Sequence, residues 1–202
     1  MAKKDFEVIK ISKKEAALIL EPYHYLTGIS KGFKSGFNYG CFYGRHLVGA
    51  IIFTGFPVPE LSKGMLGLER EDQEGLFELS RICLSPDIQA TEHNLASWFV
   101  SRAIKLLRKE TKVRVILSYA DEKFHRGVVY AACNFKYYGL TAPKKDFYIK
   151  QENGVYVKRS RGRTKNIEGE WRDRTKKHRF AMIFCNTLKI KWVEQKWEPF
   201  RV

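Results

Sequence analysis

The 202-residue sequence lacks any run close to the roughly 18–20 apolar residues that a membrane-spanning helix needs. No apolar segment follows the N-terminal Met-Ala-Lys-Lys-Asp-Phe, so we expect no secretory signal peptide. The four cysteines are far apart and form no Cys-x-x-Cys pair: Cys41, Cys83, Cys133 and Cys185. We therefore expect free, buried thiols in a reducing cytoplasm.

Acidic side chains are scarce relative to basic ones. The chain has 22 Asp and Glu against 37 Lys and Arg, which gives a net charge of +15. Nucleic acid is the favoured partner, because every phosphate that a protein neutralises releases counterions. An anionic membrane is the rival, but no basic amphipathic helix is visible to lie on one. A merely soluble basic protein is the third interpretation.

The N-terminal half predicts a helix, a β-hairpin and a long loop. Ser12 and Glu15 have the spacing of a capping box, so we expect a helix over Ser12–Glu21 that ends near Pro22. Alternating apolar residues indicate the two strands of a hairpin around Gly44-Arg45, Phe37–Tyr43 and Leu47–Thr54. The segment Gly55–Gly75 has no clear period, and we expect it to be a loop over the functional site.

The central part alternates strands with helices. The expected elements are a strand Leu76–Leu84, a helix Glu92–Glu110, a strand Val113–Leu117, a short helix Gly127–Cys133 and a strand Phe135–Leu140. Polar residues including Ser118 and Asp121 follow the second of these strands, where open α/β sheets bind ligands. Period-two alternation separates Glu78 from Arg81 on the first strand unless a bulge intervenes.

Basic residues concentrate towards the C-terminus. Lys158–Arg179 holds ten Lys and Arg against three Asp and Glu, with Trp171 among them. A solvated face is the ordinary explanation for such a run, but the concentration favours an arm that contacts DNA phosphates. We expect a hairpin around Asn153-Gly154 before it and a final strand, Arg179–Asn186, after it. The aromatic tail is expected to dock on the domain through Trp192, Trp197 and Phe200.

Four short motifs occur in an order and spacing that resemble a known family. They are Glu78-Leu-Ser-Arg81, Asn94-x-x-Ser97-Trp-Phe99, Ser118-Tyr-Ala-Asp121 and Tyr130-x-x-x-Asn134-Phe. With the order of elements, they resemble the Mom family of phage DNA-modification proteins from about Tyr23 to about Phe184. That family is built on a divergent Gcn5-related N-acetyltransferase (GNAT) core. The resemblance implies conversion of adenine in duplex DNA to its N6-(methylcarbamoyl) form, which protects phage DNA from host restriction in the bacterial cytoplasm.

The resemblance also implies the architecture. We expect an α/β (α+β) fold with a GNAT-like central mixed, mostly antiparallel sheet, flanking helices and a basic C-terminal extension. Residues 1–150 are expected to form the GNAT-like catalytic core. Residues 151–202 are expected to supply the DNA-contacting segment, the final strand and the aromatic tail of the same domain. The glycine-rich Q/R-x-x-G-x-G/A motif of GNAT enzymes is missing, however, and Thr91-Glu-His-Asn94 stands in its place.

Adenine N6 is a poor nucleophile, so a modifying enzyme must flip the base, support it with aromatic rings and remove a proton. The catalytic candidates are His24, Tyr25, Arg81, Ser118 and Asp121. Either Tyr25 or Asp121 is the expected base. Each candidate also has a structural explanation: the Tyr-His-Tyr run can pack in a core, Asp121 can cap a turn, and Arg81 can pair with Glu78.

The donor side is less defined. GNAT analogy assigns cofactor-binding roles to Tyr130, Asn94 and Ser97 and implies an acyl-coenzyme-A-type small-molecule donor. Joining the carbon of a methylcarbamoyl group to N6 is alkylation, however, which plain acetyl transfer does not accomplish. A divalent metal such as iron is a further option, for which His24, Asp121 and His125 are weak candidates.

Double-stranded DNA is the expected macromolecular partner, with no membrane role. The expected phosphate-contacting residues are Arg159, Arg161, Arg163, Lys165, Arg172, Arg174, Lys176 and Lys177. The sequence leaves the oligomeric state open, a homodimer being one option. Two other functions stay open: a conventional GNAT acyltransferase acting on a small amine or a protein lysine, and a non-catalytic DNA-binding protein. An ordinary DNA N6-methyltransferase is disfavoured, because no DPPY-like tetrapeptide or glycine-rich methyl-donor loop occurs.

Overall fold

A central β-sheet organises the part of the chain that the computed structural model describes, which is residues 5–26, 32–159 and 167–199. Its seven strands lie in the order β1-β2-β3-β4-β5-β10-β6. Neighbouring strands are antiparallel except β4 and β5, which are parallel. The strands are β1 Phe6–Lys10, β2 Phe37–Tyr43, β3 His46–Gly55, β4 Leu76–Leu84, β5 Val115–Asp121, β6 Lys136–Leu140 and β10 Lys177–Ile183. The mixed, mostly antiparallel sheet expected from the sequence is confirmed.

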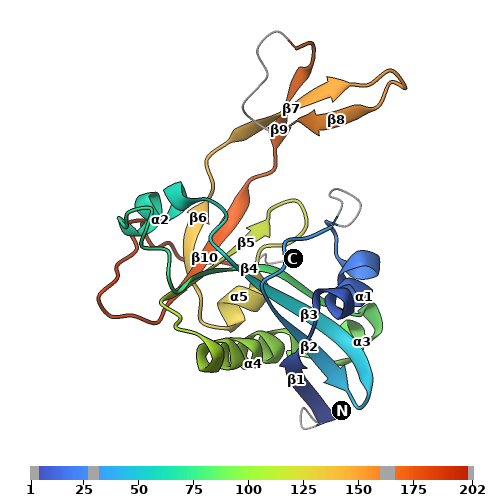
Figure 1. The fold of residues 1–202 in the computed structure, drawn as a ribbon, viewed down its shortest axis with the longest axis vertical. Helices are drawn as coiled ribbons and strands as arrows, with labels where there is room; N and C mark the ends of the chain where they lie inside the picture. Colours follow the sequence, from blue (N-terminus) through green and yellow to red (C-terminus); the bar gives the residue numbers. More distant parts are fainter. Residues whose placement is uncertain (1–4, 27–31, 160–166, 200–202) are drawn as a thin grey trace.

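Helices pack on both faces of this sheet (Figure 1). They are α1 Lys13–Tyr23, α2 Pro59–Leu66, α3 Pro86–Thr91, α4 Leu95–Glu110 and α5 Val128–Ala132. The largest apolar core lies under α4 and α5, where Phe99 and Ile51 are fully buried. The opposite face has two smaller clusters, one under α1 around Leu20 and one under α2 around Met65. Between these two smaller clusters the sheet carries polar side chains, among them Glu78, Arg81 and Lys177.

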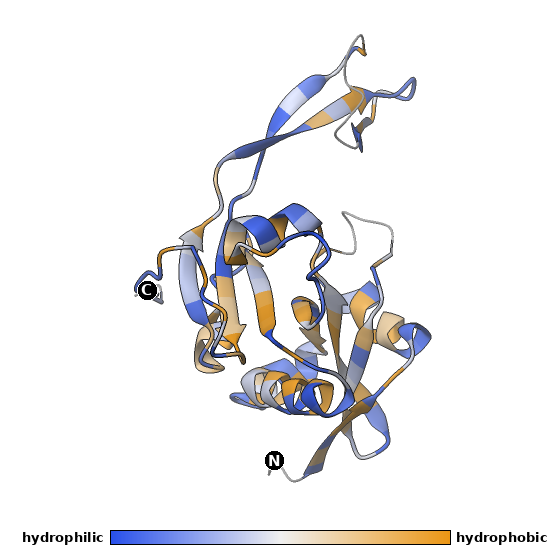
Figure 2. Ribbon diagram, turned by 60° about the vertical axis from the view of Figure 1, so that its left-hand side comes forward, coloured by the Kyte–Doolittle hydropathy of each residue, from blue (hydrophilic) through white to orange (hydrophobic). Residues whose placement is uncertain are grey.

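A second sheet of three strands, in the order β8-β7-β9, projects away from the central sheet (Figure 1 and Figure 2). Its strands are β7 Lys144–Lys150, β8 Tyr156–Arg159 and β9 Glu170–Arg174. We call this unit the ribbon. The expected hairpin around Asn153-Gly154 is the β7–β8 turn, in which Gly154 has a φ of +78°. The chain then returns to the central sheet through β10, which lies between β5 and the edge strand β6.

The parallel strands β4 and β5 are paired only at their start. Pairing runs from Leu76 opposite Val115 to Leu79 opposite Ser118, and both strands continue beyond that point. The hydroxyl of Ser118 donates a hydrogen bond of 2.9 Å to the carbonyl of Leu79 at the last paired position. A gap therefore opens between the two strands just after these residues.

A β-bulge lies in β4 at the same level. Leu79 and Arg81 stand opposite two consecutive residues of β3, which makes Ser80 the extra residue. A bulge of this kind reverses the face on which the following side chains lie. Arg81 consequently shares a face with Glu78, which is the exception that the sequence left open.

Several expected elements differ from the structure. The strand expected over Val113–Leu117 is β5 Val115–Asp121, because its pairing with β10 continues to Asp121, so Ser118 and Asp121 lie within the strand. The strand expected over Arg179–Asn186 is β10 Lys177–Ile183. The segment Gly55–Gly75 is not only a loop, because its middle forms α2, and an eight-residue helix is too short to show a clear period. The helix expected from Glu92 begins only at Leu95, because Asn94 has a left-handed backbone with φ 60° and separates α3 from α4. The first helix continues to Tyr23, since its proline lies in the last turn, where little of the helix remains to be broken.

The aromatic tail docks on the sheet, as expected for two of its three members. Trp192 contacts Tyr138 with ring centroids 6.2 Å apart. The indole N–H of Trp197 donates to the carbonyl of Arg126 at 3.1 Å. Phe200 lies outside the described residues. No helix among the described residues is long and apolar enough to cross a bilayer.

The capping box of α1 gives a first testable prediction. The Ser12 hydroxyl accepts from the N–H of Glu15 at 3.2 Å, and the Glu15 carboxylate accepts from the N–H of Ser12 at 2.6 Å. We expect Ser12→Ala to lower the free energy of unfolding by about 1 kcal/mol, measured by urea denaturation. Lys14→Ala, at an exposed position of the same helix, is the control and should change it by less than about 0.5 kcal/mol. Equal stability of the two variants would contradict the capping role.

Candidate active site

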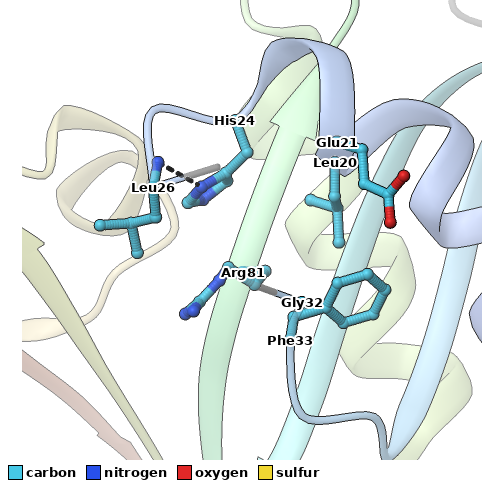
Figure 3. Close-up of a pocket in the computed structure, with 7 residues that line it drawn as sticks. All are labelled: Leu20, Glu21, His24, Leu26, Gly32, Phe33 and Arg81. Atoms are coloured by element: carbon cyan, nitrogen blue, oxygen red, sulfur yellow. Dashed lines mark hydrogen bonds between the residues drawn. The ribbon is translucent and has the colours of Figure 1, made fainter. Parts of the chain in front are cut away.

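The C-terminal end of α1 brings two ring side chains onto the sheet. His24 is the C-cap of α1, and its backbone N–H donates to the carbonyl of Leu20 at 3.1 Å. The Nδ1 atom of His24 accepts a hydrogen bond from the backbone N–H of Leu26 at 3.2 Å (Figure 3). The rings of His24 and Tyr25 stack with centroids 4.6 Å apart. The helix end therefore fixes the position of this pair.

Arg81 comes from the bulged strand β4 and meets the end of α1. Arg81 and His24 line one small pocket together with Leu20 and Phe33 (Figure 3). The Arg81 guanidinium donates to the carbonyl of Ser80, the bulged residue, at 2.7 Å. The bulge therefore determines the face of the sheet on which Arg81 lies, and its backbone carbonyl holds the guanidinium in place.

A strip of ionisable side chains crosses the sheet between the clusters under α1 and α2. Its members are Glu78 and Arg81 of β4, Tyr119 and Asp121 of β5, and Lys177 of β10. We call this set the polar strip. Burial raises the pKa of Glu78, an effect that Lys177 and Arg81 oppose, and burial lowers the pKa of Lys177. Perturbed acids and bases gathered at one place are typical of sites that transfer protons.

Asp121 ends β5 and fixes the turn that follows. Its carboxylate accepts a hydrogen bond from the N–H of Lys123 at 3.1 Å and from the hydroxyl of Thr175 at 2.9 Å. Its carbonyl accepts the backbone N–H groups of Phe124 and His125 at 2.9 and 3.0 Å. Asp121 thus has the turn-forming role that the sequence offered as the structural alternative. A carboxylate has about four acceptor sites, so it can still accept a further proton donor.

Burial and charge set the protonation of the rings near Asp121. Burial and then Asp121 raise the pKa of Tyr25, whereas Arg81 lowers it. Burial, followed by Arg81 and His125, lowers the pKa of His24 to about 4. Burial also lowers the pKa of His125, against the effect of Asp121. At neutral pH Tyr25 therefore keeps its proton, and His24 is neutral with its proton on Nε2, since Nδ1 is an acceptor.

Ser118 and Tyr130 lie on the α4–α5 side of the sheet. Ser118 is completely buried, and Tyr130 packs against Phe135 and Phe180. Burial raises the pKa of Tyr130, the hydrogen-bonded Ser118 lowers it, and the nearby Tyr25 raises it. Tyr25 comes from the opposite side of the sheet. Because Tyr25 and Tyr130 line one cavity, the gap between β4 and β5 is open from one face of the sheet to the other.

A groove leads from this gap along β4 to the start of α4. Near the gap, a cavity of about 310 Å³ is lined by Tyr25 and Tyr130. At the N-terminus of α4, a second cavity of about 210 Å³ is lined by Asn94 and Ser97. The two cavities share lining residues, namely Leu84, Gln89, Ala96, Val128 and Val129. The three residues expected to bind a cofactor therefore lie along one groove.

The N-terminus of α4 suits an anion. Its first turn contains no acidic residue, and Asn94 precedes that turn with left-handed backbone geometry. Glu92, two residues earlier, also lines the cavity. The Ser97 hydroxyl donates to the carbonyl of Asn94 at 3.0 Å. The N–H groups of a first helical turn and the helix dipole both favour negative charge.

The candidate metal ligands His24, Asp121 and His125 surround Tyr25. The ring of Tyr25 contacts His24 at 4.6 Å and His125 at 5.6 Å between centroids. Across residues 5–26, 32–159 and 167–199, no three or more His, Cys, Asp or Glu side chains form a group that could hold a metal ion.

One face of the ribbon is basic. Strand alternation and register put five cations on it: Lys144, Lys150, Lys158, Arg172 and Arg174. The Arg172 guanidinium lies over the rings of Tyr148 and Tyr156, 4.8 and 4.3 Å from their centroids. Lys158 pairs with the buried Asp146 at 2.6 Å. Arg172 pairs with Glu170, which also lies on this face. Five cations against these two carboxylates leave the face with a surplus of three positive charges.

The remaining basic candidates have different surroundings. Arg159 and Trp171 lie on the opposite ribbon face, where Trp171 packs on Phe147 at 5.2 Å between centroids. Lys176 is exposed between the ribbon and β10, whereas Lys177 belongs to the polar strip. The other three candidates, Arg161, Arg163 and Lys165, lie outside the described residues.

The structure brings four of the five catalytic candidates together around the gap: His24, Tyr25, Arg81 and Asp121. The fifth, Ser118, reaches them through Tyr130. Three neighbours were not assigned to this site from the sequence: Glu78, Phe124 and Lys177. A charged residue inside an apolar strand was a signal for Glu78. Nothing in the sequence indicated that Lys177, near the end of the basic segment Lys158–Arg179, belongs to the site.

Comparison with known proteins supports the expected family and fold. The sequence model of the Mom protein family matches residues 5–199. A comparison with curated proteins gives no match. Among solved structures, a putative acetyltransferase from Salmonella typhimurium with its cofactor acetyl-CoA has a TM-score of 0.51 at 11% identity, covering 90% of this chain and 95% of that one.

Two further structures are similar. An acetyltransferase from Bacillus subtilis in complex with CoA has a TM-score of 0.50 at 14% identity, covering 89% of this chain and 98% of that one. A GNAT-family acetyltransferase from Streptococcus pneumoniae has a TM-score of 0.50 at 11% identity, covering 88% and 98%. At these identities the likeness shows a shared fold, and the expected GNAT-like architecture is confirmed.

The environment of His24 gives a second prediction. In an NMR pH titration we expect the His24 imidazole to gain its proton only near pH 4. Arg81→Gln should raise this pKa, because it removes a nearby positive charge, whereas Arg102→Gln on the exposed side of α4 should leave it unchanged. Between the ordinary value of 6.5 and about 4, only the unfolded state binds this proton, so stability should fall as the pH falls. A His24 pKa near 6.5 would contradict the described burial.

Proposed function

Because the chain belongs to the Mom protein family, we propose that it is a DNA-modifying enzyme that converts adenine in duplex DNA to an N6-(methylcarbamoyl)adenine-type base. The modification would protect phage DNA from host restriction in the cytoplasm of the bacterial host. We propose residues 1–150 as the catalytic core. Residues 151–202 would contact DNA and complete the same domain.

The observation that carries this proposal is the convergence at the gap between β4 and β5. Tyr25, Arg81 and Asp121 meet there from three elements, and the groove towards α4 opens at the same point. An acceptor reaching the gap from the α1 side would meet a donor lying in the groove. This arrangement favours transfer chemistry over a scaffold that only binds DNA.

We assign the acceptor chemistry to the polar groups around Tyr25. The raised pKa of Tyr25 makes it a hydrogen-bond donor at neutral pH and a poor base. Asp121 is therefore the better acceptor for the N6 proton. Arg81 would stabilise negative charge on the incoming group, because its half-buried guanidinium lies at the gap.

The groove fits a coenzyme-A-type donor. The N-terminus of α4, with Asn94 and Ser97, would hold its phosphates, and the protonated Tyr130 would donate a hydrogen bond at the other end. When bound, such a carrier supplies an activated group at its thiol. The residues of this chain would orient it and keep water away from the gap.

The basic face of the ribbon is proposed to bind the DNA backbone. Its cations stand on a sheet that projects away from the central sheet and is followed directly by β10 (Figure 1). Phosphate contacts of this kind position a duplex without reading its sequence. The ribbon would therefore increase the affinity for DNA, and the residues around the gap would carry out the reaction.

Nucleoside analysis tests the proposed reaction. Plasmid DNA from cells that express the protein should contain an adenosine of increased mass by mass spectrometry. Asp121→Asn and Arg81→Gln should each reduce the new species about 100-fold, because they remove the proton acceptor and the stabilising charge. Asp87→Asn and Arg102→Gln, both exposed and away from the gap, are the matched controls and should keep it. Unmodified DNA together with acetylated amines would instead indicate a conventional acyltransferase.

Salt dependence tests the ribbon. For duplex DNA, the slope of log K against log salt concentration should fall in magnitude by about 0.9 for each phosphate contact removed. We expect this change for Arg174→Gln and again for Lys176→Gln, by fluorescence anisotropy. Arg45→Gln, in the β2–β3 turn at the other end of the molecule, should leave the slope unchanged (Figure 1). An equal change in all three variants would point to a general charge effect.

A further inference from the structure

Three aromatic rings stand in a column beside the gap. Tyr25 stacks on His24 at 4.6 Å and on Phe124 at 4.5 Å between centroids. If both rings lay on the same face of Tyr25 at these centroid distances, they would also contact each other. No contact between the rings of His24 and Phe124 occurs among the described rings. They therefore lie on opposite faces of Tyr25.

Tyr25 consequently has no open ring face for a base. A modifying enzyme of this kind is expected to support the flipped base with an aromatic ring, and other rings already cover both faces of Tyr25. His24, at the inner end, is only 9% exposed. Phe124, at the outer end, is 43% exposed.

The exposed ring is held in place. Phe124 lies in a turn that two hydrogen bonds to Asp121 hold in place. The Asp121 carboxylate accepts the backbone N–H of Lys123, and the Asp121 carbonyl accepts the backbone N–H of Phe124. A large apolar side chain on a fixed turn keeps its surface in water at a cost in stability. The ammonium of Lys123 lies over the same ring, 5.6 Å from its centroid, at the end of a flexible side chain that a stacking base would displace towards the ring edge. A planar aromatic surface next to a cation matches a nucleotide, whose base is planar and whose phosphate is negative.

We infer that Phe124 is the ring on which the flipped adenine stacks, with Lys123 next to the phosphate of that nucleotide. This inference rests on the proposed function. Stacking at the outer end of the column would leave the edge of the base beside the turn that Asp121 fixes. The column also keeps Phe124 from turning inward, since Tyr25 fills the space behind it.

The test uses the full-length protein and a duplex with a single adenine, compared with the same duplex carrying an abasic site at that position. We expect Phe124→Ala and Phe124→Leu to weaken binding to the adenine duplex about 5- to 100-fold, and to change binding to the abasic duplex little. Leucine keeps apolar bulk and loses the π face, so it separates stacking from packing. Phe124→Trp should retain the preference for adenine.

Leu18→Ala, which removes an exposed apolar side chain from α1, is the control and should bind both duplexes as the wild type does. Equal losses on both duplexes, or no loss in Phe124→Leu, would overturn the inference while leaving the proposed reaction intact. A wild type that neither modifies the adenine duplex nor prefers it to the abasic one would overturn the proposed function and the inference together. Because Phe124 is exposed, all three substitutions are expected to preserve the fold, which thermal unfolding would verify.

Discussion

The separation of β4 from β5 is the constraint on which the rest of the molecule depends. Two parallel strands share backbone hydrogen bonds only while their register holds, and the bulge at Ser80 ends that register. The same bulge turns Arg81 to the face that already carries Glu78. The extra residue Ser80 therefore has two consequences. It opens the sheet between β4 and β5, and it places the charged side chain of Arg81 beside that opening.

The stability needed to keep such an opening comes from elsewhere in the fold. The largest apolar core lies under α4 and α5, on the far side of the polar strip. The strip itself is bordered by the two smaller clusters under α1 and α2. Burial of ionisable groups such as Glu78 and Lys177 is costly, and apolar burial on both sides can offset that cost. The helix ends that border the strip also deliver His24 and Tyr25 to it.

The proposed binding of DNA would combine two different interactions. The basic face of the ribbon offers long-range attraction to phosphates, which salt weakens. The ring column beside Asp121 offers stacking, which acts only at contact distance and depends little on salt. Thr175 links the two regions, since it follows the ribbon and its hydroxyl binds the Asp121 carboxylate. The turn that carries Phe124 is thus tied to the chain that leaves the ribbon.

Local patterns in the sequence were enough to determine the capping box at Ser12, the β2–β3 hairpin, the bounds of β4 and the tyrosine-bearing helix α5, because each depends on neighbours within a few residues. The motif order also indicated the family. The sequence did not determine that β10 enters between β5 and β6, that Lys177 joins Glu78, or that both faces of Tyr25 are covered. These features depend on strand pairing and ring contacts between distant segments, and no spacing along one segment encodes them.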